Sequence, residues 1–282
     1  MLWISLVLVY GLLKGLREIA KKKALDKNTV IEVLFFYTLI SFLLVVPSAG
    51  GAIGIERGKL LPIAFKSFII FVAWMCGFKA IKKMPISIVG ILDMSRVVFS
   101  MLLALLVLKE VLTIPQAIGM LLVCAGLFAL PFGSRKDEKK ENVKPHYVLL
   151  VFISAFLNAL SGTMDKVLMK DLSSGELQFW YMLFLLGFYA AYIFLSRSKI
   201  DFKSLAKNGW VWALSIMFVI ADRCLFIANG IPESRVTVMT LIKQTGCIVT
   251  IVGGKLIFKE KNIVYKLVCA CVIIAGVAVA VL

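Results

Sequence analysis

Two cations stand in the middle of long apolar runs of this 282-residue chain. Arg96 lies within PISIVGILDMSRVVFSMLLALLVL, and Lys243 lies within RVTVMTLIKQTGCIVTIVGGKLIF. Each run is long enough to cross a bilayer, where a central charge costs about 2.5–3.5 kcal/mol on insertion scales. Such a residue needs a partner, a water-filled cavity or a ligand. The chemistry indicated is therefore the binding of a negatively charged group.

Further polar residues lie inside other apolar runs, and membrane-embedded charges normally face the interior of a helix bundle. Asp93 and Arg96 are three residues apart, so they either neutralise each other or leave Arg96, with its five donors, to bind an anion as well. Asp222 and Arg223 are adjacent and point about 100° apart, so we expect one of them to pair with a neighbouring helix. Lys243 has no acid three or four residues away. We predict a substrate site made from Lys243, Arg96, Lys14, Asn158, Asp93, Asp222, Arg223, Tyr37 and Tyr181.

Five other charged residues have simpler interpretations. Arg17 lies near the end of its run, so we expect it to snorkel to the membrane interface. Asp165 and Lys166 lie late in theirs, and we interpret them as structural charges at the level of the lipid headgroups. Glu110 and Glu260 each follow a lysine where an apolar run ends. That position favours a helix-end or gating role over contact with substrate.

The elements that must position these residues follow from composition. Hydrophobic residues make up 61% of the chain and the mean hydropathy is +0.97, whereas a soluble protein is about 45–50% apolar. The apolar runs extend along the whole length, so the sequence predicts an integral membrane protein. The net charge of +16 comes mainly from lysines in the short links between runs. The positive-inside bias and anionic lipids account for them, so we expect no nucleic-acid partner.

The apolar runs are of the length that crosses a bilayer as a helix. We predict an all-α fold with ten transmembrane helices, over about 2–20, 30–47, 62–82, 86–108, 113–132, 147–168, 176–196, 210–230, 235–258 and 264–281. The charge run SRKDEKKENVKP, residues 134–145, is a solvated linker. It separates a first five-helix unit, 1–133, from a second, 146–282.

The two units resemble each other. TVIEVLFFYTLISFLL (29–44) aligns with SSGELQFWYMLFLLGF (173–188), and KKMPIS aligns with NGIPES around their prolines. The offsets pair Lys14 with Asn158, Tyr37 with Tyr181, and Arg96 with Lys243. Two similar units of five crossings must have opposite orientations in the membrane. The sequence therefore predicts an inverted repeat, in which transporters hold substrate at the repeat interface near the midplane.

With its five-plus-five helices, the prolines at 85 and 232, the Glu of LKE and FKE, and the glycines of GMLLVCAG, the chain resembles the EamA branch of the drug/metabolite transporter superfamily. The resemblance covers essentially the whole chain. It implies a transporter that works by alternating access, with the fifth and tenth helices at the periphery. The family includes exporters of amino acids and metabolites and some importers, so the resemblance does not imply a substrate.

The predicted function follows from the excess of deep cations. A positive cavity selects anionic or zwitterionic solutes and disfavours lipophilic cations. We predict a secondary transporter of a small metabolite that carries a carboxylate or a phosphate. The alternatives are a flippase of a lipid-linked headgroup and an exporter of cationic or aromatic small molecules. A membrane transferase would need clustered aspartates or a His/Asp set, which the sequence lacks, so we predict no enzyme and no catalytic residue.

Neither metal nor cofactor is expected. The six cysteines lie in apolar runs without metal-ligand spacing, and His146 is the only histidine. We expect a multi-pass protein of the plasma (inner) membrane, a monomer or a homodimer, and coupling to H⁺, to Na⁺ or to exchange fits such a transporter. The links richest in lysine share one side, which the positive-inside rule makes cytoplasmic and which places both termini outside.

Overall fold

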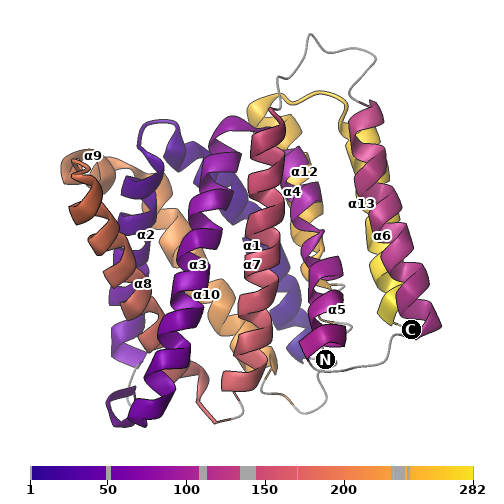
Figure 1. Ribbon diagram of the computed structural model, residues 1–282. Coiled ribbons are helices and arrows are strands. Elements are labelled where there is room, and N and C mark those ends of the chain that lie inside the picture. Colours follow the sequence, from indigo (N-terminus) through magenta and orange to yellow (C-terminus); the bar gives the residue numbers. More distant parts are fainter. Residues whose placement is uncertain are drawn as a thin grey trace.

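The computed structural model describes residues 2–48, 52–107, 113–133, 144–169, 171–229, 231, 239 and 242–281. Within these ranges the chain is a bundle of α-helices without strands, and both termini lie at one end of it (Figure 1). Five helical stretches are long and apolar enough to cross a membrane by length and composition, and three shorter helices are also apolar. The all-helical membrane fold predicted from the sequence is confirmed.

The helices fall on either side of the predicted linker. The first half contains α1 (Leu2–Leu25), α2 (Val30–Val45), α3 (Arg57–Lys83), α4 (Ile86–Asp93), α5 (Arg96–Val107) and α6 (Ile114–Gly133), with short 3-10 turns at Val46–Ser48 and Ala52–Gly54. The second half contains α7 (Pro145–Leu168), α8 (Ser174–Ser196), the short α9 (Phe202–Lys207), α10 (Gly209–Asn229), α12 (Thr245–Phe258) and α13 (Ile263–Val281). Glu110 and most of residues 230–241 lie outside the described ranges.

Local sequence explains why α2 and α8 begin where they do. Thr29 and Ser173 are the N-caps, and each accepts a hydrogen bond from the backbone of the residue three positions on. That residue is a glutamate in both halves, and Glu32 and Glu176 accept from the cap backbone at 2.8 and 2.7 Å. The two capping boxes satisfy free N–H groups at equivalent positions of the repeat.

The run around Arg96 is not one helix. We predicted one crossing over 86–108, and residues 86–103 are long and apolar enough for one. Within it α4 ends at Asp93, Met94 and Ser95 form a turn, and α5 begins at Arg96. The backbone turns tightly there, since Met94 and Ser95 donate to carbonyls three residues back, Ile91 at 3.1 Å and Leu92 at 3.0 Å. Interrupted helices are tolerated inside a membrane where they line a cavity.

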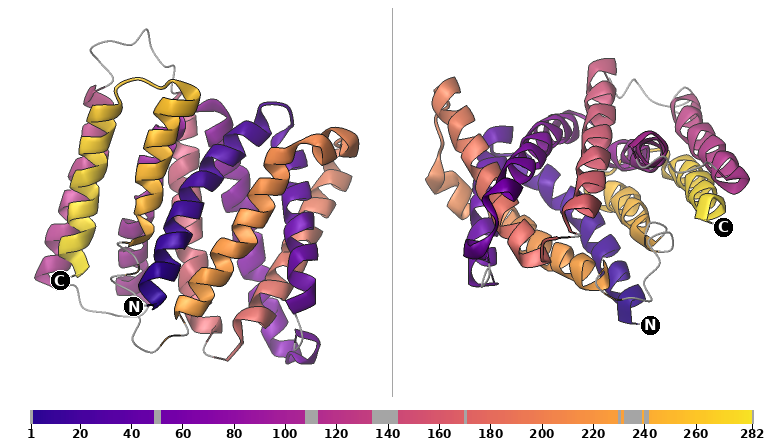
Figure 2. Two further views of the ribbon diagram at one scale, coloured as in Figure 1. Left: turned by 180° about the vertical axis from the view of Figure 1, so that it is seen from behind. Right: turned by 60° about the horizontal axis from the view of Figure 1, so that its bottom comes forward.

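Helices of opposite halves pack on each other throughout the bundle. α1 packs against α10 and α12, α3 packs against α7 and α8, and α6 packs against α13. The last pair stands at one edge of the bundle (Figures 1 and 2). A Cβ on Gly276 of α13 would lie 2.8 Å from the carbonyl oxygen of Gly119 in α6, so only glycine permits this approach.

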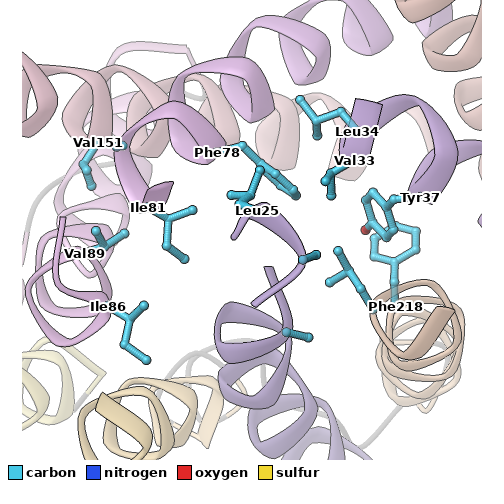
Figure 3. Close-up of a cluster of buried hydrophobic side chains, with 14 of the residues drawn as sticks. Leu25, Val33, Leu34, Tyr37, Phe78, Ile81, Ile86, Val89, Val151 and Phe218 are labelled. Atoms are coloured by element: carbon cyan, nitrogen blue, oxygen red, sulfur yellow. The ribbon is translucent and has the colours of Figure 1, made fainter. Parts of the chain in front are cut away.

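One end of the bundle is closed by apolar and polar contacts. We call it the basic end, because it holds the lysine-rich links 25–30, 83–86, 196–209 and 258–263. Next to it lies a buried apolar cluster that includes Leu25, Leu34, Phe78, Ile81 and Ile86 (Figure 3). These five side chains come from α1, α2, α3 and α4, and Val151 of α7 and Phe218 of α10 extend the cluster into the second half (Figure 3).

Polar contacts between the halves reinforce the basic end. Asn28 donates to Ser204 at 3.1 Å, and Asn208 donates to the Asn28 side chain at 2.8 Å. Glu260, which follows α12, accepts from the backbone of Ile86 at 2.6 Å and from Ser87 at the start of α4. Bonds of this kind occupy the backbone donors that a helix N-terminus leaves free.

Candidate transport cavity

A cavity of about 570 Å³ lies between the two halves. It is lined by α1, α3, α4, α5, α7, α8, α10 and α12, with a few residues of α6 and α13. Phe78, Val89, Val151 and Phe218 of the apolar cluster line it toward the basic end (Figure 3). Toward the end that holds the termini it reaches Gln116, near the start of α6. The volume suits a small organic molecule.

The centre of the predicted site is an ionic cluster on α1, α4 and α5. Asp93 contacts Lys14 Nζ at 3.2 Å through Oδ2 and accepts from Arg96 Nη2 at 2.9 Å through Oδ1. One carboxylate is therefore shared between two cations. The Nε of Arg96 is buried and has no hydrogen-bond partner among the described residues. We call Lys14, Asp93 and Arg96 the Asp93 cluster.

Lys243 lines the same cavity from the other half. Its Nζ lies 5.8 Å from the centroid of the Tyr10 ring, a cation–π distance. Lys243 is helical, Gln244 forms a turn, and α12 begins at Thr245. Arg96 directly follows a turn and Lys243 directly precedes one, so each cation lies beside a turn, although the two turns are not at equivalent positions of the repeat.

A second ionic group lies where α1, α8 and α10 meet. Arg17 contacts Asp222 at 3.7 Å and stacks on the Phe218 ring, with its Cζ 4.6 Å from the centroid. Tyr181 donates to Asp222 at 3.4 Å. Arg17 is only 9% exposed, so the expectation that it snorkels to the interface is wrong. Arg17 pairs with Asp222 of the opposite half instead of with lipid headgroups.

Lys66 and Asp165 are cavity residues that the sequence analysis did not include in the site. Lys66 Nζ lies 3.0 Å from Asp165 and 4.2 Å from the centroid of the Tyr181 ring, and only 4% of the residue is exposed. We predicted the third crossing over 62–82, which places Lys66 near its start. α3 begins five residues earlier and includes Pro62, which places Lys66 well inside the bundle.

The structure brings most of the predicted site residues to one cavity. Seven of the nine line it: Lys14, Asp93, Arg96, Asn158, Tyr181, Asp222 and Lys243. Lys14 and Asn158, which the repeat relates, are both among them. Tyr37 is buried and packs against Trp74, Phe78 and Phe218 with ring centroids 5.4–6.3 Å apart. Arg223, which we also predicted for the site, is not among the described lining residues, because adjacent residues of a helix point about 100° apart.

The described residues contain no group of three or more His, Cys, Asp or Glu side chains that could hold a metal ion. The charged groups of the cavity can bind ions and polar groups by direct contact. Hydrogen bonds with charged groups are short and about twice as strong as neutral ones. The chemistry that the cavity supports in its own right is recognition of a charged solute.

Two helical repeats around a polar cavity with interrupted helices have the architecture of a membrane transporter. The model of the EamA-like transporter family matches residues 1–131 and 146–282, so the chain belongs to that family. A solved crystal structure aligns with 99% of this chain and 96% of its own, at a TM-score of 0.67 and 17% sequence identity, and shows the same fold. No curated protein matches the sequence. The protein is a multi-pass membrane transporter with two five-helix repeats.

Proposed function

We propose that this protein is a secondary transporter that moves a small anionic or zwitterionic metabolite, carrying a carboxylate or a phosphate, by alternating access. The observation that carries the proposal is the charge of the cavity wall. The described lining residues include six Lys and Arg side chains and four Asp and Glu side chains. In a site of low dielectric such an excess attracts anions and repels cations.

The excess of positive charge lies next to the turns at Met94–Ser95 and at Gln244. Arg17, Lys66 and Lys21 each contact an acid of their own, at 3.7, 3.0 and 2.5 Å. Lys14 and Arg96 share one. This distribution favours the Asp93 cluster, with Lys243 across the cavity, as the place where the anionic group of the substrate binds.

The arrangement of the two ends supports alternating access. The cavity reaches the end of the molecule that holds the termini, whereas apolar and polar contacts between the halves close the basic end. If the lysine-rich links are cytoplasmic, as the positive-inside rule indicates, the contacts of the basic end close the cytoplasmic side. Transport would require the contacts of the basic end to open, with the inverted repeat providing an equivalent closure on the other side.

A ligand screen tests the proposal. The purified protein is heated in detergent with amino acids, organic acids, phosphorylated metabolites or quaternary amines, at constant ionic strength. A bound ligand stabilises by about 2.7 kcal/mol at a hundredfold excess over its Kd. We expect stabilisation by members of the anionic or zwitterionic sets. Stabilisation confined to quaternary amines would contradict the proposal.

A further inference from the structure

Asp93 shows how an anion binds to the cations of this cluster. Its two oxygens contact two different cations on two different helices, Lys14 of α1 and Arg96 of α5. A carboxylate of a bound metabolite would satisfy the same donors in the same way. Asp93 also holds two like charges close together, which would otherwise repel each other in a partly desolvated wall.

From this geometry we infer that Asp93 is an internal counter-anion that determines the charge of the transported solute. The inference rests on the proposed function, because it concerns the anion that the cavity binds. While Asp93 is ionised, the Asp93 cluster carries one positive charge in excess. A monoanionic group neutralises that charge, and a second negative charge on the solute meets the Asp93 carboxylate. Asp93 therefore favours monoanionic over dianionic groups, because its carboxylate repels the second negative charge of a dianion.

The unused donors of the cluster leave room for a second anion. Arg96 has five N–H donors and gives one hydrogen bond to Asp93, and its side chain is 33% exposed. Lys14 is 24% exposed and can donate three hydrogen bonds. A solute can thus bind beside Asp93 without displacing it, which is the condition for Asp93 to act on the charge of the solute.

Asp165 offers a matched comparison within the same cavity. It is also an aspartate of the cavity wall, but its ion pair is with Lys66 of α3 and not with Lys14 or Arg96. Replacing either aspartate with asparagine removes one negative charge from the wall at nearly constant volume. Only Asp93→Asn removes the negative charge that lies next to Lys14 and Arg96.

The experiment measures charge preference with pairs of anions that differ by one charge. The probes are succinate with its monoamide succinamate, and methyl phosphate with dimethyl phosphate, each at constant ionic strength. The full-length protein in detergent is titrated with each probe, and the apparent Kd is taken from the rise in apparent Tm. In the wild type the monoanion of a pair should bind more tightly.

Asp93→Asn should shift the ratio of affinities toward the dianion at least tenfold, about 1.4 kcal/mol, whereas Asp165→Asn should leave it within about twofold. Asp93→Glu should keep the wild-type preference, because the charge is retained. Arg96→Gln should move the ratio in the opposite direction, so the test does not depend on the folding of one variant.

Three results would overturn the inference. An unchanged ratio in Asp93→Asn, or an equal shift in Asp165→Asn, would refute it while leaving the anion-binding cavity in place. If no probe stabilised the wild type, the anion site itself would be absent, and the proposed function would fail together with this inference.

Discussion

The two ends of helix α4 use the same chemistry for different purposes. At its start, Glu260 accepts from the backbone of Ile86 and Ser87 and contacts Lys266 at 3.6 Å, and the side chains of this acid and lysine are 5% and 4% exposed. At its end, Asp93 contacts Lys14 and Arg96, and these side chains are 23–33% exposed. The first carboxylate fixes a helix, and the second leaves charged donors open to a cavity.

Burial and unused donors, more than residue type, therefore separate a structural charge from a binding charge. A buried carboxylate whose acceptors are occupied cannot exchange partners without exposing its neighbours. A half-exposed cluster with spare N–H groups can accept a ligand at low cost. Variants at the start of α4 should therefore lose stability, and variants at its end should lose affinity for the ligand.

The largest effect is expected at the start of α4. Glu260→Ala leaves two backbone N–H groups and the Lys266 ammonium buried without their acceptor, which should cost about 3–5 kcal/mol of stability. The apparent Tm of the detergent-solubilised protein measures it. The control is Glu56→Ala, since Glu56 is exposed and lies 4.0 Å from Lys59, and such pairs contribute little. Equal apparent Tm values for Glu260→Ala and Glu56→Ala would show that Glu260 does not stabilise the fold.

The next effect is expected at the end of α4, and it should appear in binding. Lys14→Met removes one cation of the Asp93 cluster and leaves Asp93 with Arg96. Affinity for the best anion of the ligand screen should fall about tenfold to a hundredfold, since hydrogen bonds to charged groups are worth about 1.5–3 kcal/mol. The apparent Tm without ligand should change much less than in Glu260→Ala. A large loss of Tm with unchanged affinity would reverse the comparison.

The smallest effect is expected at Gln116, at the rim of the cavity. Its side chain accepts from the backbone of Thr113 at 3.0 Å, so it caps α6. Gln116→Leu should lower stability by about 0.5–1 kcal/mol, as loss of a cap does, and should change ligand affinity by less than about threefold. Transport abolished as fully as by changes at Arg96 would show that α6 is part of the binding wall.

Much of the fold could be predicted because its signals are local. Apolar length predicted an all-helical membrane fold, and the described residues contain five long apolar helical stretches and three shorter ones. The two capping boxes lie in the aligned segments 29–44 and 173–188. The turn at Met94–Ser95 could not be predicted, because no proline or glycine interrupts the apolar run there. The interruption depends on the tertiary environment, where α4 is anchored by Glu260 and Asp93 by Lys14.

The site could be predicted in part. Depth in an apolar run identified Arg96, Lys243 and Lys14, since a membrane charge must face the interior. Lys66 was not included because it lies near the start of the predicted crossing 62–82, where a lysine side chain can extend to the interface. Lys266 lies near the start of the predicted crossing 264–281, but it is buried beside Glu260. Whether a lysine near a helix end is buried depends on the helices packed against it, and the local sequence does not contain that information.

The central claim is that cations at the helix breaks of both repeats bind the anionic group of the substrate. Lys243→Ala tests it most directly, because Lys243 belongs to the opposite half from the Asp93 cluster and lines the same cavity. The measurement is the Kd for the best ligand of the screen, with Lys259→Ala, at the end of α12, as the matched control. We predict a loss of about tenfold to a hundredfold for Lys243→Ala, partial recovery in Lys243→Arg, and no change in the control. Near wild-type affinity in a folded Lys243→Ala protein would contradict the account.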